Sequence, residues 1–173
     1  HSVRALVQAP APDFLVIRVA ELPAGVSEAN AEVRGLHPGR TYWHHAAGVA
    51  TGTSVASAAG TLPLRLDGAK LPTIVISTAR GTRVITTSTT LTEDSESILI
   101  DADDVTLDCG GHRVGGGGEF LPFAVYAEGR RNVVIRNSTG IGNALIGVFL
   151  RSCPDARIEV VQSGRGKGMV ERA

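Results

Sequence analysis

The sequence contains few residues of several types, and these shortages bear on which classes of protein it can belong to. Among 173 residues there are two cysteines, one methionine, one tryptophan and two lysines, and aromatic residues make up 4%. Two cysteines, Cys109 and Cys153, neither require nor exclude an oxidising compartment. The formal net charge is zero, which argues against a broad charged surface for nucleic acid or anionic membrane.

Long apolar runs are also missing. None approaches the roughly 18 residues that a membrane span needs, so we expect no such span. What the sequence does have is 43% hydrophobic residues with 20% charged residues and 21 glycines, a composition of a folded, loop-rich chain. Valine, isoleucine, threonine and serine are abundant, and the sequence therefore predicts an all-β protein.

The first half alternates short strand-like runs with turns that contain proline or glycine. Such spacing favours a β-sandwich, which we assign to residues 1–79. The predicted strands are Val3–Ala9, Phe14–Leu22, Ala31–Leu36, Thr41–Gly48, Thr61–Leu66 and Thr73–Thr78.

The second half contains a motif that occurs three times, each copy beginning with Asp or Asn. The copies begin at Asp104, Asn132 and Asp155, 28 and 23 residues apart. A period of this size is typical of a solenoid, in which each repeat buries its apolar face against its neighbours. The runs at Val125 and Val148 form a second strand set with the same 23-residue spacing. We therefore assign residues 80–173 to about three rungs of parallel strands.

The alternation within each copy predicts which side chains face the core. The residues expected to face inward are Val105, Leu107, Cys109, Val133, Ile135, Asn137, Ala156, Ile158 and Val160. Asp108, Arg136 and Glu159 share one position of the motif and should face outward on successive rungs about 4.8 Å apart. Their alternating charges predict an ion-pair ladder.

One segment of the first half resembles a known family. Leu36-His-Pro-Gly-Arg-Thr-Tyr42 is similar to the Leu-x-Pro-Gly-x-x-Tyr segment of fibronectin type III domains. The resemblance implies a tyrosine corner, in which the Tyr42 hydroxyl bonds a nearby backbone group. It covers about 30 residues, and two strand-like runs follow the strand of Tyr42 where the family has one. The domain is therefore described as fibronectin type III-like or Ig-like.

The segment from about residue 80 onward resembles a second family. The phrase Val105-Thr-Leu-Asp-Cys-Gly-Gly-His112 and the Gly-Thr-Arg-Val-Ile run before it are similar to the opening of right-handed parallel β-helix proteins. That family includes pectate-lyase-like enzymes and the NosD-like periplasmic proteins. Together the two resemblances imply an N-terminal β-sandwich followed by a short right-handed parallel β-helix. They also imply a secreted or cell-surface location.

Three aspartates beside the first repeat are candidate metal ligands. Asp101, Asp103 and Asp104, with Asp108 nearby, could hold calcium as the resemblance to pectate lyases implies. The calcium-loop pattern with its glycine and terminal glutamate is absent. The alternative interpretation, which we favour, is that these aspartates form the turns between strands through local side-chain bonds.

Two further pairs are candidates for chemistry or binding. Asp108 and Arg136 could form a lyase site, with an ion-pair ladder as the simpler interpretation. Trp43 and His45 share one face of a predicted strand, where the tryptophan could stack on a sugar ring. The alternative is that one face of this strand lies in the core and the other under a neighbouring segment.

Three functional hypotheses follow, and the first is favoured. It is an extracellular structural or adhesive protein that self-associates into an oligomer or filament, because the rungs are few and no cap is evident after Val161. The second is a carbohydrate-active protein, either a polysaccharide lyase or a glycoside hydrolase, and the third is a carbohydrate-binding module centred on Trp43. No cofactor other than calcium is implied.

Overall fold

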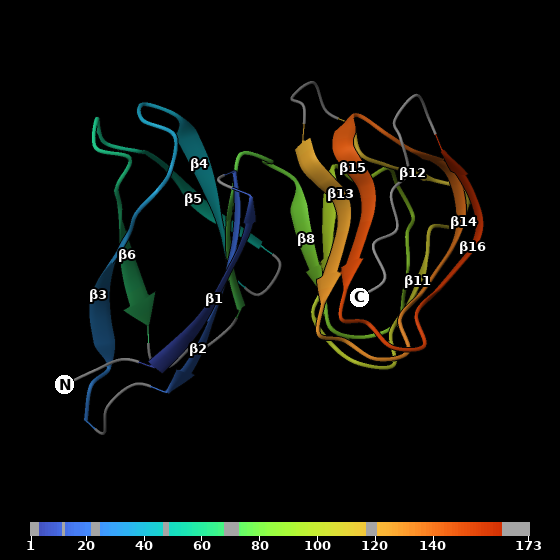
Figure 1. Ribbon diagram of the computed structural model, residues 1–173, viewed down its shortest axis with the longest axis horizontal. Helices are drawn as coiled ribbons and strands as arrows, with labels where there is room; N and C mark the ends of the chain where they lie inside the picture. Colours follow the sequence, from blue (N-terminus) through green and yellow to red (C-terminus); the bar gives the residue numbers. More distant parts are fainter. Residues whose placement is uncertain are drawn as a thin grey trace. The chain divides into compact units, whose positions relative to one another are not determined.

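The computed structural model describes residues 4–11, 13–21, 25–46, 49–67, 73–116 and 121–163 (Figure 1). Every regular element in these ranges is a strand, which confirms the all-β prediction. The chain divides into two compact units, His1–Thr78 and Ala79–Ala173. Within the described ranges, no helix has the length and hydropathy to cross a membrane. The side chain of Val160, which is predicted to face inward, lies outside what the structure describes.

The first unit has a five-stranded antiparallel sheet of order β1-β2-β7-β4-β5 and a two-stranded antiparallel sheet of β3 and β6. One core cluster draws side chains from both sheets, among them Tyr42, Leu62 and Ile76. The strands are β1 (Arg4–Ala11), β2 (Phe14–Glu21), β3 (Glu28–Val33), β4 (Thr41–Ala46), β5 (Val49–Val55), β6 (Leu62–Asp67) and β7 (Thr73–Ser77).

Strand β5 was not predicted, and its sequence explains why. Val49-Ala-Thr-Gly-Thr-Ser-Val55 has a β-branched residue at every second position, which suits a strand. Its central glycine and its lack of large apolar residues hide it from the apolar alternation that predicted the other strands. It forms because the antiparallel register with β4 pairs Tyr42 with Ser54 and Trp43 with Thr53, with a bulge between His44 and His45. Backbone pairing with β4 adds to this local preference.

The second unit has two parallel sheets whose strands alternate along the sequence (Figure 1). The chain passes through a strand of one sheet, turns into a strand of the other and returns, and we call each such passage a rung. Four rungs result instead of about three, because the threonine-rich segment at 82–90 adds one. One sheet contains β8 (Thr82–Ile85), β10 (Ser97–Ile100), β13 (Leu121–Glu128) and β15 (Ala144–Arg151), and the other β9 (Thr89–Thr90), β11 (Thr106–Asp108), β12 (Arg113–Val114), β14 (Val134–Ile141) and β16 (Arg157–Ser163).

The Asp or Asn that opens each motif copy has a conformational role. Asp104, Asn132 and Asp155 have φ values of 58°, 50° and 61°. Among residues with a side chain, Asn and Asp tolerate this left-handed region best. The backbone N–H of Asp104 donates to the carbonyl of Arg131, and that of Asn132 to the carbonyl of Pro154. The Asp or Asn at the start of each motif copy therefore marks a stacked turn.

The inward-facing prediction is confirmed at most positions. Leu107, Ile135 and Ile158 are in register on β11, β14 and β16, and all three belong to or pack against the core cluster of the unit. Further members of the predicted set in that cluster are Val105, Cys109, Val133 and Ala156.

Asn137 is the exception, because it is exposed and the prediction that it faces inward is wrong. Its φ of 56° breaks the two-residue alternation that an extended strand imposes. The side chain turns outward, and its Nδ2 donates to the carboxylate of Asp108 at 3.1 Å.

Candidate functional site

Asp108, Arg136 and Glu159 are in register on β11, β14 and β16 of the second unit, as predicted. Arg136 Nε donates to Asp108 Oδ2 at 3.0 Å. Asp108 Oδ1 also accepts from the backbone N–H of Gly110 at 2.9 Å. Although Glu159 lies next to Arg136, no ion pair joins them in the part of the chain described here. The predicted ladder therefore has one step.

Electrostatics at Asp108 favour its charged form. The pKa of this carboxyl is held below its usual value, first by the hydrogen bond from the Gly110 N–H, then by the Asn137 amide and by Arg136. A general base in a lyase needs a pKa near the working pH and a free lone pair toward the substrate. Asp108 is a stable anion engaged by three donors of its own chain, and Arg136 is engaged by Asp108.

The predicted metal ligands likewise have partners, and each partner lies one rung further along. Arg130 Nη2 donates to Asp101 Oδ1 at 2.6 Å. The backbone N–H of Arg131 donates to Asp103 Oδ1 at 3.1 Å, which is the largest cause of a lowered pKa at Asp103. Asp104 Oδ1 accepts from Asn132 Nδ2 at 3.0 Å.

These carboxylates thus spread along the turns instead of converging. Across the described ranges, no three His, Cys, Asp or Glu side chains come together in a way that could hold a metal ion. The hydrogen bonds described here for Asp101, Asp103 and Asp104 reach the next rung, whereas the favoured interpretation expected local bonds within each turn.

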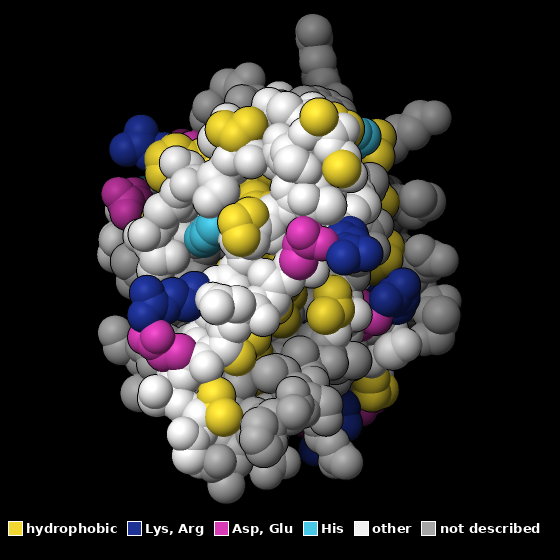
Figure 2. Space-filling view, turned by 90° about the vertical axis from the view of Figure 1, so that its left-hand side faces the viewer, with side chains coloured by type: hydrophobic (Ala, Val, Ile, Leu, Met, Phe, Trp, Pro, Cys, Tyr) yellow, Lys and Arg dark blue, Asp and Glu magenta, His cyan; other side chains and the backbone are white. Residues whose placement is uncertain are grey.

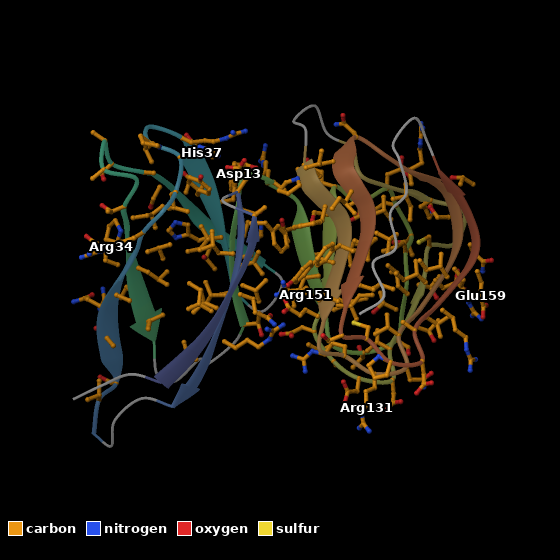
Figure 3. The ribbon with its side chains drawn as sticks, viewed as in Figure 1. Asp13, Arg34, His37, Arg131, Arg151 and Glu159 are labelled. Atoms are coloured by element: carbon orange, nitrogen blue, oxygen red, sulfur yellow. The ribbon has the colours of Figure 1, made fainter. Side chains whose placement is uncertain are left out.

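The basic partners Arg130, Arg131 and Arg151 were not predicted. Arg151 Nε donates to Glu128 Oε1 at 2.7 Å, and the two residues are in register on β15 and β13. Figure 3 shows Arg131 at the turns of the second unit and Arg151 at the end of its strand. The repeat spacing could have identified them, because each lies 23 to 29 residues after its acidic partner.

Trp43 and His45 both lie on β4, as predicted, where Trp43 pairs with Ser77 and His45 with Val75. Tyr42 belongs to the core cluster and the other two do not, so they occupy the opposite face of the sheet. Trp43 is half-buried and His45 is buried. The structure places the pair together on one face without showing a ligand role for either residue.

Tyr42 makes the backbone hydrogen bond that the fibronectin resemblance implied. Its hydroxyl accepts from the N–H of His37 at 3.1 Å and donates to Asp13 Oδ1 at 3.1 Å. Asp13 also lies 3.4 Å from Arg40 Nη1. Figure 3 shows Asp13 and His37 near one another at one end of the first unit. Tyr42 thereby ties the loop before β4 to the start of β2.

Neither cysteine has the surroundings of a nucleophile. Both are free thiols, Cys109 buried and Cys153 half-buried. Burial raises the pKa of Cys109 to about 11 and also raises the pKa of Cys153. Because the thiolate is the reactive species, Cys109 acts as a small apolar core residue, as predicted.

The two outermost rungs of the second unit differ in chemistry. On the first rung the core-facing positions include Arg83 and the buried Ile85, in register with Ile98 and Ile100, and Thr89, in register with Leu107. Arg83 Nη2 lies 3.3 Å from Glu93 Oε1, so an ion pair borders the core there. On the last rung the equivalent positions are Val148, Leu150 and Ile158.

Surface charges elsewhere are also locally balanced. On β3 and β6 of the first unit, Arg34 pairs with Glu32 at 2.6 Å and Arg65 pairs with Glu28. Figure 2 shows basic and acidic side chains next to one another on the displayed face, with hydrophobic side chains dispersed between them. This face offers no single-sign surface for an anionic or cationic polymer.

Comparison with protein-family models finds no match to this chain. No curated protein and no solved structure matches it either.

Proposed function

We propose that this is an extracellular structural or adhesive protein that self-associates. In this proposal the first unit is a fibronectin type III-like or Ig-like β-sandwich and the second is a short right-handed parallel β-helix. Two sheets around one core cluster support the first assignment. Four parallel rungs in register support the second.

The observation that carries the proposal is the outer edge of the last rung. Within the described ranges, β15 pairs only with β13 and β16 only with β14. Strand edges with free backbone groups are templates for pairing with another chain. Ile158 on this rung is only partly buried although it packs against the core. Another chain placed on this edge would complete both the backbone pairing and the burial of Ile158.

The contacts of the charged residues favour a structural function over carbohydrate cleavage. Asp101, Asp103, Asp104 and Asp108 accept hydrogen bonds from residues of the next rung. These contacts hold successive rungs in register, which is the work of a scaffold. A lyase would instead need some of these groups directed at a sugar acid or its calcium ion.

Size-exclusion chromatography with light scattering, together with negative-stain images, tests the proposal on the full chain. We expect the wild-type mass to be at least twice the 18.0 kDa of one chain. In Ile158→Lys the mass should fall to that of one chain, because lysine places a charge in the apolar contact at the edge of the last rung. Val55→Lys is the matched control, since Val55 is an exposed apolar strand residue of the first unit.

Circular dichroism melting must show that Ile158→Lys is folded for its mass to be interpreted. A wild-type mass of 18 kDa at every concentration would contradict self-association. Equal loss of assembly in Val55→Lys would show that the edge of the last rung is not the contact.

A further inference from the structure

The chemistry of the two outer rungs determines what kind of assembly is possible, if the proposed self-association through β15 and β16 is correct. A filament requires the last rung of one copy to stack on the first rung of the next. A closed dimer requires two last rungs to meet about a two-fold axis. The core-facing and outward-facing residues of the outer rungs distinguish these arrangements.

Stacking of unlike ends is disfavoured by polar groups on the first rung. By continuation of the same registers it would place Val148 and Ile158 against Arg83 and Thr89, although Leu150 would meet the apolar Ile85. Arg83 is engaged by Glu93, so apolar residues would cover an ion pair and remove it from water. Burial of such a pair is unfavourable unless further hydrogen bonds compensate.

Stacking of like ends brings apolar residues together. The inward residues of the last rung include Val148, Leu150 and Ile158. Two copies meeting at this rung would join their cores through these side chains and remove apolar surface from water on both. The strands of the two copies would then run antiparallel, because a two-fold axis reverses their direction.

The charges on β16 are self-complementary in that arrangement. Its sequence is Arg-Ile-Glu-Val-Val-Gln-Ser, so Arg157 and Glu159 are its charged residues. Both are exposed and lie on either side of the inward-facing Ile158. In an antiparallel pair centred on Ile158, Arg157 of each copy is directly opposite Glu159 of the other. Figure 3 shows Glu159 on the outer side of β16.

We propose that the protein forms a closed two-fold dimer in which β16 pairs antiparallel with β16 of a second copy, centred on Ile158. The interface contains two Arg157–Glu159 pairs on the outside and the joined apolar cores on the inside. The first rung, where Arg83 pairs with Glu93, takes no part in the contact, and the assembly does not extend into a filament.

A charge-swap series tests the pairing by sedimentation equilibrium of the full chain. Arg157→Glu and Glu159→Arg each replace two attractive pairs by two repulsive pairs, and we expect each to weaken dimerisation about tenfold or more. The double variant Arg157→Glu/Glu159→Arg restores opposite charges across the axis and should regain most of the wild-type affinity. Arg34→Glu, an exposed reversal on the first unit, is the matched control and should leave the dimer unchanged.

The outcomes separate this inference from the proposed function. A wild-type chain that stays at 18 kDa overturns both. A mass that grows with concentration beyond 36 kDa, about twice that of one chain, keeps self-association and overturns the closed dimer. A dimer that is indifferent to the single reversals, or that the double variant fails to restore, overturns the pairing centred on Ile158.

Discussion

Arg136 donates from Nε to the carboxylate of Asp108 across 3.0 Å, although 28 residues separate them in sequence. The pair joins two successive rungs on the outer face of the second unit. Asp108 is also held by Gly110 and Asn137, so the carboxylate connects its own turn to the next rung. Asp108, which the sequence offered as a candidate catalytic residue, thus makes structural contacts between rungs.

The contribution of Asp108 to stability should depend on pH. Its pKa is lower in the folded chain than in the unfolded chain, chiefly through the Gly110 N–H. The stabilisation is therefore present above the unfolded pKa of about 3.9 and is lost as the pH falls through the lower folded value. Urea unfolding at pH 7 should show Asp108→Asn less stable than wild type, and the difference should shrink in acid. A difference that does not shrink in acid would contradict this role of the Asp108 charge.

Two neighbouring glycines should differ sharply in their tolerance of a methyl group. At Gly115, with φ of 88°, an added Cβ would lie 1.8 Å from the carbonyl oxygen of Gly142, whereas at Gly116 nothing lies within 4 Å. Gly115→Ala should lower the free energy of unfolding by roughly 3 kcal/mol, from strain and steric overlap. Gly116→Ala should change it by well under ~1 kcal/mol. Equal effects in denaturant titrations would contradict the tight turn at Gly115.

Tyr42→Phe should destabilise the first unit by about 1–2 kcal/mol. The substitution keeps the buried ring and removes the hydroxyl that accepts from His37 N–H and donates to Asp13. Fluorescence of the single tryptophan, Trp43, reports unfolding of this unit in urea. Asp13→Asn keeps an acceptor for the hydroxyl and should have a smaller effect. A larger loss in Asp13→Asn would mean that the ion pair with Arg40 dominates.

His44 should make the first unit less stable in mild acid. Burial lowers its pKa, and the neighbouring His45 lowers it further; its Nε2 is buried without a hydrogen-bond partner. The pKa of His44 is lower in the folded chain than its value of about 6.5 in the unfolded chain. The stabilisation is therefore present above the unfolded pKa and is lost as the pH falls through the folded pKa. The melting temperature followed by Trp43 fluorescence should therefore drop from pH 8 to pH 5. In His44→Gln the slope should be reduced, and an unchanged slope would assign it to other groups.

The two thiols should differ in their reaction with iodoacetamide. The pKa of Cys109 is raised to about 11 by burial, and its sulfur lies in the core cluster. Peptide mapping after native labelling at pH 7.5 should find Cys153 modified first and Cys109 only after unfolding in urea. Rapid native modification of Cys109 would show that the rungs open readily.

Local patterns in the sequence were enough to predict several features. Alternation of apolar and polar residues placed Leu107 and Ile135 inside and Asp108 and Arg136 outside, because a strand turns successive side chains to opposite faces. The spacing of Asp104, Asn132 and Asp155 indicated the stacked turns, since Asp and Asn suit the left-handed conformation that these turns adopt.

Other features were decided only by the tertiary structure, because they depend on neighbours distant in sequence. The pairing of β5 with β4 could not be predicted from its segment, which has no large apolar residues. Asn137 faces outward because a local left-handed backbone interrupts the alternation and Asp108 of the previous rung accepts its amide. The residue types at Asp101 and Asp103 allowed either a calcium site or local bonds within the turns. Stacking of the rungs instead gives these carboxylates Arg130 and Arg131 as partners. A carboxylate that the chain's own cations and N–H groups already satisfy gains less free energy from binding a metal.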